Sequence, residues 1–118
     1  MTNRRNPILT LFFALTLTAL SAAAQEKPRI IELHTKRFEF GPKELVLKKG
    51  ETVTLRVTSD DVAHGIFQRA LKIDTVVQPG ETQDITITPQ TAGRFITICH
   101  HFCGSQHGSM KMIIAVEE

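Results

Sequence analysis

The chain has 118 residues, which is room for one domain, and its charge is almost balanced, with 14 Lys and Arg against 12 Asp and Glu. No basic stripe interleaved with aromatic residues is present, so we expect no nucleic-acid partner. The sequence also lacks a Ser/His/Asp grouping, paired carboxylates and a phosphate-binding loop, and it therefore predicts no small-molecule substrate.

Residues 1–24 are predicted to form a secretory signal peptide. A short basic start precedes an apolar run from Ile8 to Leu20, and Ala22 and Ala24 have the spacing that a signal peptidase recognises. An uncleaved N-terminal anchor is the alternative, although the run is short for a bilayer span of about 20 residues. We therefore expect a periplasmic or otherwise exported domain over residues 25–118, which does not span the membrane once the signal is cleaved.

The first half of this domain carries the pattern of short β-strands. The run "ELVLKK" is rich in β-forming residues. After it, Val53, Leu55 and Val57 alternate with polar residues. A period of two indicates a strand with one buried side and one solvent-facing side.

The second half continues in the same way. Ile85 and Ile87 alternate with threonines, and "GRFITIC" and "MKMIIAV" add two more β-rich runs. Turn signals separate the runs, at Gly41-Pro42, Lys49-Gly50, Pro79-Gly80 and Gly93. Short strands at this spacing favour an all-β sandwich or barrel over a helical fold.

Both cysteines lie in the stretch "CHHFCGSQHGSM", residues 99–110, between the last two predicted strands. The stretch also holds three of the five histidines and one of the three methionines. Thiolate and thioether are soft ligands and imidazole is intermediate, so this set selects copper over hard cations, and zinc has little use for the methionine. The alternative is a loop closed by a Cys99–Cys103 disulfide, with incidental histidines.

His64, in the segment "DDVAHGIF", is the candidate for a further ligand. It lies in a predicted turn after the Val53 strand, and a sandwich brings turns from different strands to the same end. A surface-turn histidine is the alternative. Blue-copper sites use one Cys, two His and a weak axial ligand. Because the loop offers one thiol more, the sequence favours a binuclear site in which each sulfur bridges two metal ions.

At this point the residues resemble a known family. The loop "CHHFCGSQHGSM" is similar to the Cys-x-x-x-Cys-x-x-x-His-x-x-Met loop of the CuA cupredoxin domain, found in subunit II of haem-copper oxidases and at the C-terminus of nitrous oxide reductases. Upstream, "FEFGPKELVLKKGETVTLRVTSDDVAHGIF" is similar to the early cupredoxin strands and the first ligand turn. The resemblance implies a cupredoxin-like Greek-key β-sandwich.

The resemblance also implies a ligand set for two copper ions, made of two bridging thiolates, two terminal imidazoles and two weak axial ligands. It implies that Cys99 and Cys103 are the bridging thiolates and that His64 and His107 are the terminal imidazoles. Met110 and the backbone carbonyl of His101 are then the weak axial ligands. The oxidase pattern usually has Glu at the position of His101, where its side chain also contacts a magnesium at the interface with the catalytic subunit. The chain thus departs from the pattern at that interface.

Two further loop residues carry expectations of their own. His100 is expected to be an exposed loop histidine rather than a ligand, because metal ligands are few and fixed in place. Phe102 is expected to pack over the site as part of an apolar shell that limits access of water.

A fully ligated copper pair leaves no open position for a substrate, so the predicted function is non-catalytic electron transfer. The expected partner is a c-type cytochrome or a terminal oxidase, and the chain would count as an oxidoreductase component only if it docks to a haem-copper oxidase. The alternative is a periplasmic copper-binding protein that delivers copper to a terminal oxidase. A third reading is a metal-free β domain with a Cys99–Cys103 disulfide.

Overall fold

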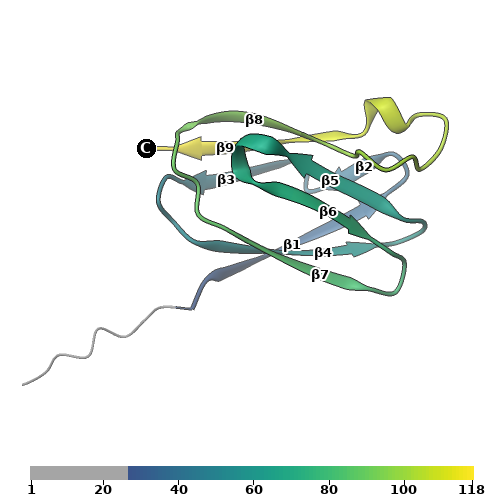
Figure 1. Ribbon diagram of the computed structural model, residues 1–118, viewed down its shortest axis with the longest axis horizontal. Coiled ribbons are helices and arrows are strands. Elements are labelled where there is room, and N and C mark those ends of the chain that lie inside the picture. The colour runs from purple at the N-terminus through teal and green to yellow at the C-terminus, as the bar shows by residue number, and fades with distance from the viewer. Residues whose placement is uncertain (1–26) are drawn as a thin grey trace, which may run out of the picture.

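Residues 27–118 are described by the computed structural model, in which they form two β-sheets packed face to face (Figure 1). The predicted signal peptide, residues 1–24, lies outside the described residues. Within 27–118 the only helical segments are two short 3-10 turns, and no helix has the length and apolar character needed to cross a membrane.

The strands are β1 (Arg29–Lys36), β2 (Glu39–Gly41), β3 (Glu44–Lys48), β4 (Val53–Ser59), β5 (His64–Gln68), β6 (Ile73–Val77), β7 (Thr82–Ile87), β8 (Gly93–Ile98) and β9 (Lys111–Glu117). The 3-10 turns are η1 (Arg69–Leu71) and η2 (His107–Ser109).

The strand order is that of a sandwich in which the chain passes repeatedly between layers. The four-stranded sheet has the order β2-β1-β4-β7, and the five-stranded sheet has the order β3-β9-β8-β5-β6. The pairs β1/β4 and β3/β9 are parallel, and the other pairs are antiparallel. Many neighbours in the sheets are far apart in the sequence, as in Greek-key connections. The predicted all-β sandwich is confirmed.

The apolar core lies between the two sheets. Val53, Leu55 and Val57 of β4 are completely buried, as their spacing predicts, and Ile66 and Ile114 of the opposite sheet are buried as well. Each aliphatic side chain of this kind contributes about 1.5–3 kcal/mol when it is fully buried. Because this packing holds the strands in place, it also fixes the positions of the connections at their ends.

The predicted runs match β3, β4, β7, β8 and β9, whereas no predicted run covers β1, β2, β5 or β6. In β6 the small polar Thr75 is half-buried and Val76 is exposed, which blurs the period of two. β5 has only five residues and includes Gly65, a weak strand former. His64 is therefore the first residue of a strand, directly after the turn in which the sequence places it.

Three connections meet at one end of the sandwich, on the right in Figure 1. They are the β1–β2 connection (37–38), the β4–β5 turn (60–63) and the cysteine loop (99–110) between β8 and β9. Hydrogen bonds from Arg37 to Asp61 and from Arg37 to Cys103 join the three, and a bond from Gly65 of β5 to Cys99 ties the cysteine loop to the sheet. This end holds all the residues that the sequence nominates as ligands.

Candidate metal centre

His64, Cys99 and Cys103 form a compact, buried cluster. One ring nitrogen of His64 and the two Sγ atoms all lie within 4.8 Å of one another. Both thiols are free, and their Sγ atoms are 4.0 Å apart. The histidine ring is completely shielded from solvent, and the cysteines are 3% and 4% exposed. Three potential ligands from two distant parts of the chain thus share one site.

The cysteine loop brings two more candidate ligands to the same place. The Cys99 backbone N–H donates to the Met110 carbonyl at 3.2 Å and closes the loop at its base. The Sδ atom of Met110 lies 3.9 Å from the Sγ of Cys103, and Nδ1 of His107 lies 3.8 Å from the same sulfur. Met110 is buried and His107 is half-buried.

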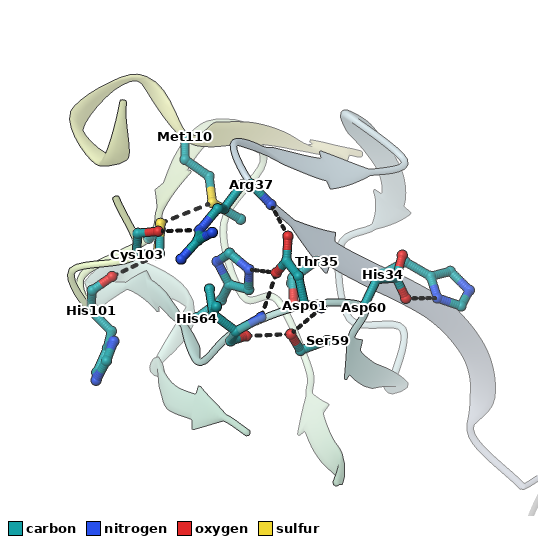
Figure 2. Close-up of polar contacts among 12 residues, drawn as sticks. His34, Thr35, Arg37, Ser59, Asp60, Asp61, His64, His101, Cys103 and Met110 are labelled. Carbon is teal, nitrogen blue, oxygen red and sulfur yellow. Dashed lines mark hydrogen bonds and ion pairs between the residues drawn. The ribbon is translucent and has the colours of Figure 1, made fainter. Parts of the chain in front are cut away.

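The sixth candidate, the backbone carbonyl of His101, also faces the cluster. Its oxygen accepts a hydrogen bond from the Cys99 thiol at 3.1 Å. The His101 side chain is exposed, and Figure 2 shows it pointing away from the sulfur atoms. The backbone N–H of Gly65 donates to the Cys99 sulfur at 3.3 Å. The structure therefore brings together the donor atoms of all six predicted residues.

His64 has one ring nitrogen that is free to bind a metal. Its Nε2 lies 2.7 Å from Oδ1 of Asp61 (Figure 2), whereas its buried Nδ1 has no hydrogen-bond partner among residues 27–118. Leaving a buried polar atom unsatisfied costs about 1–3 kcal/mol. A metal ion beside the two thiols would use this nitrogen lone pair, so the orphaned atom fits a metal site.

Asp61 is the residue that fixes the orientation of His64. Burial alone would raise its pKa, but hydrogen bonds from the Arg37 N–H, the His64 ring and the Val62 N–H outweigh that effect and lower the pKa to about 2. The carboxylate therefore stays charged at neutral pH and is placed to accept a hydrogen bond from Nε2 of His64. Asp61 is not among the site residues predicted from the sequence, although its position three residues before a histidine is the signal that could have identified it.

The Cys103 thiol of the metal-free site holds its proton firmly. Burial, together with the neighbouring Cys99, raises the pKa of Cys103 to about 11. A bound metal requires thiolates, so binding must release the thiol protons. Two thiols, a thioether and imidazole nitrogens form a soft donor set that fits copper better than magnesium or calcium.

His100 is not a ligand candidate, because its ring is engaged elsewhere. Its Nε2 lies 2.7 Å from Oδ1 of Asp74, and the ring stacks on Phe67 with centroids 5.4 Å apart. The residue is exposed, as expected, yet it anchors the loop to β5 and β6. Gly65 makes this approach possible, because a Cβ at that position would lie 2.2 Å from Nδ1 of His100.

The expectation that Phe102 covers the site is wrong. Its side chain is 74% exposed, and its ring lies against His107 with centroids 5.8 Å apart. Beside it, a surface cleft of about 300 Å³ opens between Arg37 and the cysteine loop. The loop runs along the surface at this point, and the apolar shielding of the thiols comes instead from the buried Met110 and the core behind it.

Comparisons with known proteins agree with this geometry. A family model described as "Cupredoxin-like domain" matches residues 7–114. Cytochrome c oxidase subunit 2 of Thermus thermophilus is 30% identical over 99 residues, which are 82% of this chain and 73% of the relative. Nitrous-oxide reductase of Cupriavidus necator is 34% identical over 82 residues, which are 66% of this chain but only 13% of that protein.

A solved structure gives the same fold. The periplasmic domain of cytochrome oxidase subunit II from Bradyrhizobium japonicum superimposes with a TM-score of 0.71 at 19% identity. The match covers 80% of this chain and 87% of that domain.

Proposed function

The chain belongs to the family of cupredoxin-like domains, and from this premise we propose that it is an exported electron carrier that holds two copper ions in a CuA-type centre. It is a cupredoxin domain similar to the copper domain of cytochrome c oxidase subunit 2. The observation that carries the proposal is the buried Nδ1 of His64, which has no hydrogen-bond partner among the described residues and belongs to a cluster with two free thiols.

The proposed ligands are the six residues whose donor atoms meet at this end of the sandwich. Cys99 and Cys103 would hold the two ions through their thiolates, His64 and His107 would hold them through ring nitrogens, and Met110 and the His101 carbonyl would be weaker donors. Two thiols support a pair of ions over a single one, because a mononuclear blue-copper site uses one thiolate.

When bound, such a copper pair accepts and releases one electron. The protein's part is to keep the donor atoms in place during this change. His64 opens β5, Cys99 directly follows β8, and Met110 directly precedes β9, so each is held by the five-stranded sheet. Asp61 holds the histidine ring from the other side. Donors that move little between the two redox states favour fast electron transfer.

The proposed partner is a redox protein, either a c-type cytochrome or a terminal oxidase. The homology to cytochrome c oxidase subunit 2 supports association with an oxidase. The half-buried His107 and the exposed Phe102 form the edge of the site that a partner could approach. Export through a signal peptide over residues 1–24 remains part of the proposal, and the periplasmic location of the Bradyrhizobium domain supports it.

Copper analysis combined with electron spin resonance tests the proposal. We expect two copper ions per chain and, with one unpaired electron in the pair, hyperfine splitting from two equivalent nuclei. A single copper with a localised spin would refute the binuclear centre. Repeated oxidation and reduction in the presence of a copper chelator separates the two copper functions, because a carrier keeps both ions whereas a delivery protein releases them.

A further inference from the structure

The connection between β1 and β2 consists of only Arg37 and Phe38, and it lies at the end of the sandwich that holds the candidate metal centre. Arg37 makes two hydrogen bonds there. Its backbone N–H donates to Oδ2 of Asp61 at 2.8 Å, and its side-chain Nε donates to the Cys103 carbonyl at 2.8 Å. One residue thus contacts two segments that lie 24 and 66 positions away in the sequence.

These two contacts lead to opposite sides of the cluster. On one side, Oδ1 of Asp61 lies 2.7 Å from Nε2 of His64. On the other side, the Cys103 carbonyl belongs to the residue whose Sγ lies near both Cys99 and Met110. Figure 2 shows Arg37 between Asp61 and Cys103, with a dashed line to each.

Phe38 fixes the same part of the cysteine loop by an independent contact. A Cβ added at Gly104 would lie 2.8 Å from the Phe38 ring, and Gly104 has a φ of +141°, which disfavours other residues. The ring and the loop backbone are therefore in close contact at the residue that follows Cys103. The β1–β2 connection holds this loop through both a hydrogen bond and a packed ring.

The hydrogen bond from Arg37 to the loop does not result from a nearby ion pair. Among residues 27–118, the Arg37 side chain forms no ion pair with a carboxylate. The nearby Asp61 accepts a hydrogen bond from the Arg37 backbone N–H instead and pairs with His64. The guanidinium lines the cleft beside Cys103, so its positive charge lies at the cysteine loop.

We propose that Arg37 is a positioning residue of the metal centre, which fixes how far the His64 side of the site lies from Cys103. The inference rests on the proposed copper function and goes beyond it, because the ligand pattern does not include Arg37. Outer contacts of this type orient metal ligands, and their loss typically costs about 10-fold to 100-fold in metal affinity.

The test uses three variants of the full-length mature protein. Arg37→Met keeps most of the side-chain stem but removes the donor and the charge. Arg37→Lys keeps the charge but puts a methylene where Nε stands. Lys36→Gln is the matched control, because Lys36 is the adjacent cation but pairs with Glu39 at 3.1 Å and, among residues 27–118, makes no hydrogen bond or ion pair with Asp61, His64 or the cysteine loop.

For each variant we would measure the copper dissociation constant by chelator competition, the midpoint potential and the spin resonance spectrum. Arg37→Met should bind copper at least about 10-fold more weakly than wild type. It should also have a lower potential, because losing a nearby positive charge favours the oxidised centre. Arg37→Lys should likewise bind more weakly, with a smaller change in potential. Lys36→Gln should keep the wild-type affinity.

Two outcomes would overturn the inference. One is an Arg37→Met protein that matches Lys36→Gln in affinity, potential and spectrum. The other is an Arg37→Lys protein with wild-type affinity, since charge alone would then be sufficient. Denaturant unfolding of the metal-free variants shows whether a variant is misfolded, and Arg37→Lys remains a test if Arg37→Met does not fold. If the copper proposal itself is wrong, the wild-type protein will bind no copper pair, which distinguishes that failure from the failure of this inference.

Discussion

Replacing Asp61 with Asn should destabilise the metal-free protein in a way that depends on pH. The folded protein lowers the pKa of Asp61 from 3.8 to about 2, so the charged carboxylate stabilises the fold. At about 1.4 kcal/mol per pH unit this shift corresponds to about 2 kcal/mol. The side chain is 32% exposed, and solvent screening reduces the expected contribution to about 1 kcal/mol.

The sign of the pH dependence follows from the direction of that shift. A group whose pKa is lower in the folded state stabilises the fold above its unfolded pKa, near 3.8, and loses this effect as the pH falls through about 2. Asp61→Asn should therefore be less stable than wild type by about 1 kcal/mol at pH 7, and the difference should shrink as the pH approaches 2.

Denaturant unfolding of the two proteins at pH 7 and at several acidic pH values provides the measurement. Asp60→Asn is the matched control, because Asp60 is adjacent, 53% exposed and 3.8 Å from His34. An Asp61→Asn protein as stable as wild type at pH 7 would show that the carboxylate does not stabilise the fold. A stability difference that stays constant down to the lowest pH would likewise exclude the charge of Asp61 as its cause.

Three further predictions concern the cysteine loop and its surroundings. Met110→Leu should keep both copper ions but change the potential, because a thioether is only a weak axial ligand, whereas Cys103→Ser should abolish the two-copper spin resonance spectrum. Metal-free protein exposed to air should form a disulfide between the two loop cysteines, so mass analysis after alkylation should find no modified thiol, and copper uptake should return only after reduction. Gly65→Ala should lower stability by about 1–3 kcal/mol in thermal unfolding, because its Cβ would clash with His100, whereas Gly108→Ala, with nothing within 4 Å, should not. Equal thermal stability of the two alanine variants would contradict the predicted clash. A full two-copper signal in Cys103→Ser would contradict the role of that thiol. Copper uptake by the oxidised protein would contradict the requirement for free thiols.

The sequence predicts those parts of the fold that depend on local patterns. The alternation at Val53, Leu55 and Val57 marks β4 because one side of that strand is completely buried. The cysteine loop is recognisable because its donor residues are close in sequence and chemically unusual. Nearby residues with a strong chemical signature can be read without knowing the tertiary structure.

The parts that the sequence does not predict depend on contacts between distant segments. Nothing near Arg37 indicates that its side chain reaches a carbonyl 66 positions away. The ring of His100 is fixed by Asp74, 26 positions earlier, and by Phe67. For Phe102 the sequence predicts a contact that the structure does not have. An aromatic residue between two candidate ligands suggests burial, but the path of the loop leaves its side chain in solvent. Side-chain partners of this kind are set by topology rather than by local propensity.

The strand order has a mechanical consequence for the site. All six proposed ligands come from the five-stranded sheet or from its cysteine loop, whereas Arg37 and Phe38 belong to the connection between two strands of the four-stranded sheet. The bond from Arg37 to Cys103 therefore ties one layer to the other at the end where the donor atoms meet. Sliding of one sheet over the other would strain the Arg37–Cys103 hydrogen bond, so an ion bound by the five-stranded sheet and its loop would be coupled to the other layer through Arg37. Loading the site should then slow amide hydrogen exchange in β1 and β4 as well as in the strands that carry the ligands.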